Sequence, residues 1–348
     1  MLSVRAELPP ALLDFAAHEL HRVLPGPTLF HLAGRRPEPL LVSVLLHGDE
    51  ETGWDAVRSY LRAQQGRELP RALSLFIGNV KAAQLRRRYL PDQPDYNRIW
   101  TDLAATKDLP ERAMTRAVFE QMRTRGVFAS IDLHNNTGVN PHYACVRRLD
   151  DRFLHLATLF SRTVVYFTKP EGVQAEAFAT LCPAVTVECG QAGQAHGVEH
   201  AADYLDACLH LAELPQYPVA PHDIDLYHSV AIVKVPADVS VGFGAQPADI
   251  RLVEDLDRLN FRELPVDTLL GHVRSGNGVG LQVWDEHGRD VAHRFLRLVE
   301  NEIRTAVPVM PSMFTVNLRA IRADCLGYLT ERPTPPAGAG SASESRTA

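Results

Sequence analysis

The chain has 348 residues, with 36 Lys or Arg and 42 Asp or Glu, so its formal net charge is −6. Hydrophobic residues make up 45% and charged residues 22% of the composition, which is typical of a globular protein and excludes a largely disordered one. The mild negative charge argues against nucleic acid or an anionic membrane surface as the main partner. The 15 histidines are many for such a chain, and we expect the function to involve some of them.

The sequence shows no pattern typical of a membrane span, a signal peptide or a disulfide framework. The longest largely apolar run, at residues 40–46, is too short for a bilayer, which needs ~20 apolar residues. Residues 1–13 do not follow the charged-then-apolar layout of a signal peptide. The five cysteines lack the paired spacing of a disulfide framework or a Cys-type zinc site. We therefore expect a cytoplasmic protein, and homo-oligomerisation is left open.

The first two thirds of the chain alternate short apolar runs with amphipathic ones. Compact runs rich in branched residues predict buried strands at 40–46, 73–77, 127–133, 164–167 and 184–187. Apolar residues at three-to-four spacing predict helices at 52–63, 109–123, 153–160 and 198–211. This alternation predicts an α/β fold with a mostly parallel central sheet flanked by helices.

The pattern changes after Pro215. Short alternating runs at 230–235, 272–283 and 291–298 predict strands, and residues 285–288 (DEHG) predict a turn between the last two. Residues 333–348 are rich in Pro, Ala, Gly and Ser. We expect an α/β domain at 1–214, a smaller β-rich C-terminal domain at 215–330 and a disordered tail at 331–348.

Polar residues follow three of the predicted strands. His47 and Glu50 follow the first, His134 follows the run at 127–133, and Glu188 follows the run at 184–187. Ligands of an open parallel sheet bind at the carboxyl ends of its strands, so these four side chains are expected to converge. Two imidazoles and one carboxylate form a known catalytic zinc set, and a second carboxylate can take a proton from water. Each residue alone is a weak signal, and the argument depends on their joint placement.

The ordered motifs resemble the zinc carboxypeptidase superfamily, and most closely its succinylglutamate desuccinylase/aspartoacylase branch. The resemblance runs from about His47 to about Ala201. The motifs that carry it are HGDEETG at 47–53, Arg88-Tyr89, DYNR at 95–98, DLHNNT at 132–137, VECG at 187–190 and Gly197-Val198.

This resemblance implies a site and a reaction. It implies one zinc ion held by His47, Glu50 and His134. It further implies that Glu188 is the general base and that Arg88 polarises the scissile carbonyl. Asn97 and Arg98 would bind a substrate carboxylate, and the smaller C-terminal domain would narrow the site. Asp132 is expected on the other side of its strand, where it either orients a ligand or caps a helix.

The chain departs from the family pattern in four places. HGNE is replaced by HGDE, DLNR is replaced by DYNR, and the gap between Arg88 and Asn97 looks about two residues longer than usual. In the aspartoacylase branch an arginine about ten residues before the catalytic glutamate helps to bind a second carboxylate. Residues 163–188 of this chain contain no arginine, only Lys169. Acetylaspartate is therefore expected to be a poor substrate.

Other motifs have simpler interpretations. Residues 196–200 (HGVEH) fit an H-x-x-E-H zinc pattern, but Gly197 at a helix start favours an ordinary helix terminus. Residues 86–88 (RRR) could form a basic patch, but a solvated helix end with Arg88 turned inward is simpler. Cys189 has no nucleophile motif around it.

Three functions remain open from the sequence. The first is a zinc amidohydrolase that removes the acyl group from an N-acyl amino acid or a related small carboxylate substrate. The second is a metallocarboxypeptidase that uses the same four residues on peptides. The third is a binding protein without activity, which the complete set of ligands and base disfavours. We favour the first, because a closing β domain would exclude long peptides.

Overall fold

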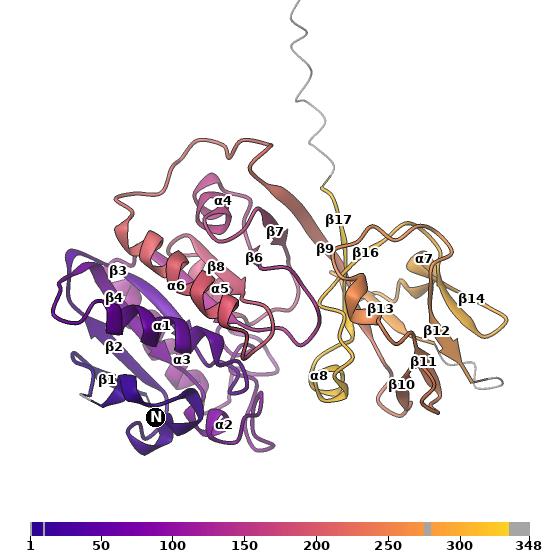
Figure 1. The fold of residues 1–348 in the computed structure, drawn as a ribbon, viewed down its shortest axis with the longest axis horizontal. Helices are drawn as coiled ribbons and strands as arrows, with labels where there is room; N and C mark the ends of the chain where they lie inside the picture. The colour runs from indigo at the N-terminus through magenta and orange to yellow at the C-terminus, as the bar shows by residue number, and fades with distance from the viewer. Residues whose placement is uncertain (1, 10, 275–279, 334–348) are drawn as a thin grey trace, which may run out of the picture.

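A sheet of 12 strands runs through the computed structural model, which describes residues 2–9, 11–274 and 280–333 (Figure 1). Its strands lie in the order β1-β2-β4-β3-β5-β8-β6-β7-β9-β17-β16, with β13 paired to β9. Most neighbouring pairs from β1 to β9 are parallel, and β2–β4 and β6–β8 are antiparallel. The predicted mostly parallel sheet is confirmed.

The strands of this sheet are β1 (Ser3–Arg5), β2 (Thr28–Leu32), β3 (Gly34–Val44), β4 (Leu69–Ile77), β5 (Ala129–His134), β6 (Tyr143–Val146), β7 (Thr163–Tyr166), β8 (Ala184–Glu188), β9 (Asp225–Lys234), β13 (Gln282–Asp285), β16 (Met310–Ser312) and β17 (Gly327–Glu331). All residues of β5 and β8 are buried, as are the last six of β3. Helices cover both faces of such a sheet, which is why these strands are apolar runs without alternation.

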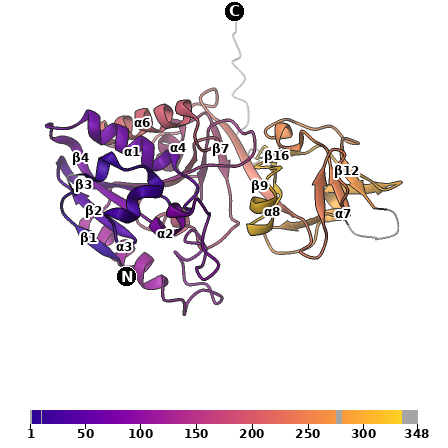
Figure 2. The same ribbon diagram turned by 60° about the horizontal axis from the view of Figure 1, so that its bottom comes forward.

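The helices are α1 (Thr52–Ala63), α2 (Val80–Gln84), α3 (Arg112–Arg125), α4 (Asp151–Thr158), α5 (Gln174–Phe178), α6 (Ala195–His210), α7 (Ala292–Phe295) and α8 (Leu318–Ala323), with short 3₁₀ turns at Leu12–Asp14, Ala17–Arg22 and Leu256–Leu259. Helices α1 and α6 pack against each other, and α3 packs against β3 from the other side of the sheet (Figure 2). Helix α3 is followed by Gly126 as its C-cap, whose φ of +68° suits a glycine.

A smaller antiparallel and parallel sheet of 5 strands forms beside the large one (Figure 1). Its order is β10 (Val241–Phe243), β11 (Ile250–Leu252), β12 (Leu269–Val273), β15 (Glu302–Thr305) and β14 (Leu296–Val299). Strand β9 joins the two parts, because Leu226 packs on the core of the large sheet whereas Ala231 and Val233 belong to a second core. The boundary at 214/215 stays a prediction, and the large sheet continues beyond it.

Every predicted helix and strand before residue 212 is present, with ends shifted by up to six residues; α1 has the predicted bounds. Two C-terminal predictions are wrong. The run at 272–283 is not one strand: β12 ends at Val273 and pairs in the small sheet, and β13 begins at Gln282 and pairs with β9. The run at 291–298 begins as the short helix α7 before β14.

The turn at 285–288 is confirmed, since the N–H of Gly288 donates to the carbonyl of Asp285. From residue 334 on, the predicted tail lies outside the described residues. Within the described part of the chain, no helix combines the length and apolar character needed to cross a membrane.

Candidate active site

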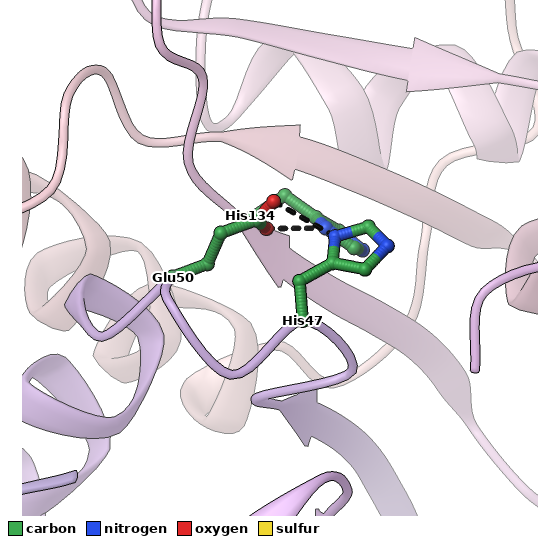
Figure 3. Close-up of side chains that lie close together, drawn as sticks. All are labelled: His47, Glu50 and His134. Atoms are coloured by element: carbon green, nitrogen blue, oxygen red, sulfur yellow. Dashed lines mark hydrogen bonds and ion pairs between the residues drawn. The ribbon is translucent and has the colours of Figure 1, made fainter. Parts of the chain in front are cut away.

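Three potential metal ligands meet at the carboxyl ends of β3 and β5 (Figure 3). Ligand atoms of His47, Glu50 and His134 lie within 4.8 Å of one another, and all three residues are buried. Nδ1 of His47 is 2.7 Å from Oε1 of Glu50, and Nδ1 of His134 is 2.7 Å from Oε2 of the same carboxylate. They are the one such cluster found among the described residues.

The loop after β3 brings His47 and Glu50 together through a tight local turn. Leu45 has a φ of +56°, uncommon for a residue with a side chain, and it turns the chain out of the strand. The N–H of Gly48 donates to the carbonyl of Arg88 at 3.1 Å. A Cβ at position 48 would lie 2.2 Å from the backbone nitrogen of Ala83, so this close approach requires glycine.

Asn135 ties the strand-end loops to one another. Its N–H donates to Oε2 of Glu50 at 3.1 Å, and its side-chain amide donates to the carbonyl of Gly190 at 2.8 Å. Its side-chain oxygen accepts from the N–H of Thr52 at 3.2 Å. The loops after β3, β5 and β8 are thus held together by one buried residue.

The Nε2 atom of each histidine contacts a carboxylate. Nε2 of His47 is 3.0 Å from Oδ1 of Asp95, and Nε2 of His134 is 2.7 Å from Oδ2 of Asp132. The expectation that Asp132 faces the other side of its strand is wrong. Side chains two apart on a strand share a face, so Asp132 and His134 point the same way. This arrangement leaves Nδ1 of both rings as the coordinating atom, as in metal sites where a carboxylate orients the histidine.

The charges of the cluster fit a cation. Burial opposes a charge on His134, but the carboxylates of Asp132 and Glu50 outweigh it and raise its pKa well above the usual value. Burial would raise the pKa of Glu50, and the two histidines lower it instead. Three carboxylates around two imidazoles therefore favour positive charge at their centre. The donor set of two Nδ1 atoms and one carboxylate suits a divalent ion such as zinc.

Glu188 is the last residue of β8 and is the register partner of His134 on β5. Its side chain is buried, and Oε2 has no hydrogen-bond partner among the described residues. Burial raises its pKa to about 7, against an opposing effect of His134. A carboxylate whose pKa lies near neutrality can both take and return a proton.

Arg88 lies between the cluster and two further carboxylates. It donates to Oδ2 of Asp95 from Nε at 3.1 Å and from Nη2 at 2.9 Å, and its Nη1 is 3.7 Å from Oε1 of Glu50. Nη2 of Arg88 also lies 3.4 Å from Oδ2 of Asp324, as does Nη2 of Arg98 at 3.0 Å. Arg86 and Arg87 are exposed, so only Arg88 of this run turns inward, as expected.

Asn97 adjoins the cluster as well. Its side-chain oxygen accepts from the N–H of Gln174 at 3.0 Å, and its Nδ2 is 3.2 Å from Nε2 of His134. When Nε2 of His134 carries the hydrogen that it donates to Asp132, it has no lone pair for Asn97. The amide hydrogens of Asn97 are then available to a substrate.

Two spaces meet at the cluster. An inner cavity of about 100 Å³ is lined by Glu188, Arg98, Tyr143 and Phe167, among others. An outer groove of about 810 Å³ is lined by residues of both parts of the chain, including Arg87, Gln191 and Arg319. Five residues line both spaces and form the neck between them: Glu50, Arg88, Asn135, Met313 and Asp324.

The alternative motifs fall outside the site. His196 and His200 lie in α6 and stack on the ring of His142, with centroids 5.4 and 4.7 Å away. Nε2 of His200 is 2.7 Å from the carbonyl of Phe160, so this ring nitrogen is engaged. Burial raises the pKa of the Cys189 thiol well above its usual value, which disfavours a nucleophile.

Comparison with known proteins identifies the same part of the chain. Residues 38–209 match the model of the succinylglutamate desuccinylase/aspartoacylase catalytic domain. No match is found among curated proteins.

Three solved structures share the fold over most of their length. Succinylglutamate desuccinylase from Chromobacterium violaceum has a TM-score of 0.55 at 18% identity, covering 87% of this chain and 87% of that chain. Murine aminoacylase 3 has a TM-score of 0.54 at 17% identity, covering 86% and 96%. A succinylglutamate desuccinylase/aspartoacylase from Rhodobacter sphaeroides has a TM-score of 0.58 at 14% identity, covering 87% and 88%.

The parallel sheet, with a His–Glu–His set at its strand ends, defines a hydrolase of the zinc carboxypeptidase-like class that acts on amide bonds. Within this class, residues 38–209 belong to the succinylglutamate desuccinylase/aspartoacylase catalytic-domain family.

Proposed function

We propose that the protein is a zinc-dependent deacylase of N-acyl amino acids or related small carboxylates. One observation carries the proposal: the buried Glu188, whose Oε2 has no hydrogen-bond partner in the described part of the chain, sits beside His134 at the edge where the donor set lies. A structural glutamate is normally paired when buried. An unpaired one at this place suits a group that exchanges a proton with water and a leaving amine.

The roles of the residues follow from their contacts. His47, Glu50 and His134 would hold one zinc ion per chain, with Asp95 and Asp132 fixing the two rings. When bound, the ion supplies the Lewis acidity that activates a water and polarises the acyl carbonyl. Zinc is favoured over other divalent ions by the two nitrogen donors and the single carboxylate.

Glu188 takes the proton from the attacking water and returns it to the nitrogen as the C–N bond breaks. Arg88 stabilises the negative charge that develops on the acyl oxygen, because a guanidinium keeps its charge and offers several N–H donors. Arg98, with Asn97 beside it, binds the carboxylate of the substrate through a charge-assisted pair of hydrogen bonds. The products are a free carboxylic acid and an amino acid.

The size of the outer groove keeps the carboxypeptidase alternative open. A volume of about 810 Å³ lies in the range of drug-sized ligand sites, so the smaller part of the chain does not close the site to long acyl groups. A short peptide could lie there with its C-terminal residue in the inner cavity. The inner cavity of about 100 Å³ would then restrict that residue to a small one.

The test combines metal analysis with a substrate panel. The purified protein is expected to contain about one zinc per chain, and to release amino acids from N-acetyl, N-succinyl and longer N-acyl derivatives faster than from dipeptides. Faster cleavage of peptides would favour the carboxypeptidase. No amide hydrolysis by the zinc-loaded protein would contradict both. A cytoplasmic location remains a prediction.

A further inference from the structure

A carboxylate from the C-terminal part of the chain reaches into the active site. Asp324 directly follows α8, which lies on the side of the smaller part that faces the larger one (Figures 1 and 2). Its Oδ2 is 3.0 Å from Nη2 of Arg98 and 3.4 Å from Nη2 of Arg88. The chain is anchored there, because the hydroxyl of Tyr89 donates to the carbonyl of Ala323 at 3.3 Å. Nothing in the sequence near Asp324 signals this contact.

Asp324 changes the charge that a substrate meets. Arg88 and Arg98 carry two positive charges, and Asp95 and Asp324 carry two negative ones, so these four groups are neutral together. Burial alone would raise the pKa of Asp324, but the guanidinium groups of Arg98 and Arg88 outweigh it and keep the carboxylate ionised. Lys169 also lines the inner cavity, but its ammonium group is 2.8 Å from Glu171.

The amine half of the substrate belongs in the inner cavity. Glu188 lines that cavity, whereas the outer groove does not include it. The leaving nitrogen must lie beside Glu188 to receive its proton, so the amino acid occupies the inner cavity and the acyl group points to the groove. The amino acid therefore meets both Arg98 and Asp324.

A substrate with a carboxylate alone would break an existing ion pair. Nη2 of Arg98 already donates to Oδ2 of Asp324, whose side chain is only 29% exposed, so a carboxylate that takes this donor displaces Asp324 from it. Asp324 would keep only its longer contact with Arg88, at 3.4 Å, and weakening the pairing of a partly buried charge is costly. A substrate that also carries a cationic group avoids this cost: its carboxylate takes Arg98 and its cation takes Asp324. Both arginine contacts use Oδ2 of Asp324, so a cation bound at Oδ1 would compete with neither of them.

We propose that Asp324 determines specificity, and that the enzyme selects N-acyl amino acids whose side chain carries an ammonium or guanidinium group. The inference rests on the proposed deacylase function and names the substrate class of that site. The small inner cavity favours short side chains within this class.

The experiment compares two substrates of matched length, Nα-acetyl-L-ornithine and N-acetyl-L-norleucine, with the zinc-loaded enzyme. We expect kcat/KM to be about 10- to 100-fold higher for the ornithine derivative, which is the range of one charge-assisted hydrogen bond. Asp324→Asn should lower activity on the ornithine derivative and raise it on the norleucine derivative. Asp238→Asn changes an exposed aspartate of the same part of the chain and should leave the ratio unchanged. Equal rates in the wild type, or an equal loss for both substrates in Asp324→Asn, would overturn the proposal.

A binding measurement separates this proposal from the deacylase function. Calorimetry with Glu188→Gln, which should bind without turnover, measures the affinity of both derivatives with and without Asp324→Asn. Preferential binding that depends on Asp324, without hydrolysis by the wild type, would support the charge selection and contradict the deacylase. Hydrolysis without any preference in rate or affinity would contradict the charge selection alone.

Discussion

His134 and Glu188 are register partners on the neighbouring parallel strands β5 and β8. Each is the last residue of its strand, and both side chains are buried. A metal ligand and the proposed base are therefore placed by backbone hydrogen bonding within the sheet and not by flexible loops. Sites on rigid elements hold their geometry more accurately than sites on loops, which proton transfer at a fixed distance requires.

This pair allows metal binding and base catalysis to be separated. His134→Ala removes one of three ligands and should lose both zinc and activity. Glu188→Gln keeps the ligands and should retain about one zinc per chain while kcat falls at least ~100-fold, because general-base catalysis contributes about 10²–10⁴. Metal analysis and amine release on the same preparations test this. A Glu188→Gln enzyme with near wild-type kcat would mean that another group is the base.

The pKa of Glu188 also predicts how the metal-free protein responds to pH. Its folded value of about 7 lies above the ordinary value of 4.5, so between these pH values the folded protein keeps a proton that the unfolded chain loses. The free energy of unfolding should fall as pH rises through this window, by up to about 1.4 kcal/mol per unit of the pKa difference.

Glu188→Gln should remove that part of the pH dependence. Urea unfolding of the metal-free wild type and variant at pH 5 and pH 8 gives the comparison. We expect the variant to gain stability relative to the wild type on going from pH 5 to pH 8. Parallel stability profiles would contradict the assignment of the raised pKa to Glu188.

Arg88 is expected to act mainly in the transition state. Arg88→Ala should lower kcat by about 10²–10³ with a smaller change in KM, because its contact strengthens as charge develops on the acyl oxygen. Its ion pair with Asp95 also supports His47, so zinc content is measured alongside. Arg67→Ala is the control, since Arg67 is an exposed arginine. A raised KM at unchanged kcat would assign Arg88 to ground-state binding.

Gly48 is expected to be required for the metal site. A Cβ there would lie 2.2 Å from the backbone nitrogen of Ala83 and 2.3 Å from the carbonyl carbon of Ala82. Gly48→Ala should therefore destabilise the protein by at least ~2 kcal/mol and lower its zinc content. Gly26→Ala is a matched control, because a Cβ there meets nothing within 4 Å. Equal melting temperatures for the two variants would show that the loop can relax.

Acetylaspartate is expected to be a poor substrate. Its second carboxylate needs a cation, and Lys169, the only basic residue of the segment 163–188, has its ammonium group 2.8 Å from Glu171. Asp324 adds a negative charge near the same cavity. Turnover of acetylaspartate far above that of other acyl-amino acids would contradict this prediction. A kinetic comparison with N-acetyl-asparagine isolates the effect of the charge.

The sequence predicts the part of the site that depends on strand ends. His47, Glu50, His134 and Glu188 follow apolar runs that are easy to recognise, and parallel pairing brings them together. Asp95 belongs to the DYNR motif, but the sequence predicts no role for it. Its contact with His47 depends on how a long loop folds back. Strand β6 is not among the predicted strands, and it reverses direction against β8, which breaks the parallel order that the alternation of strands and helices predicts.

Asp324 could not be predicted for a different reason. It is 226 residues from Arg98, and its position depends on strand β17 pairing with β9. Local patterns carry no information on such a distant contact. The prediction of a single strand at 272–283 is wrong for the same reason. The run looks continuous in sequence, but β12 and β13 pair in different sheets.

The neck residues have a consequence for how this enzyme could diversify. All three proposed metal ligands lie between positions 47 and 134, whereas Asp324 and Met313 reach the neck from near the end of the described chain. Changes in residues 310–331 could therefore alter which substrate enters without disturbing the hydrolytic chemistry. An engineer who wishes to redirect the enzyme to a new acyl-amino acid would vary this stretch first and leave the strand-end loops intact.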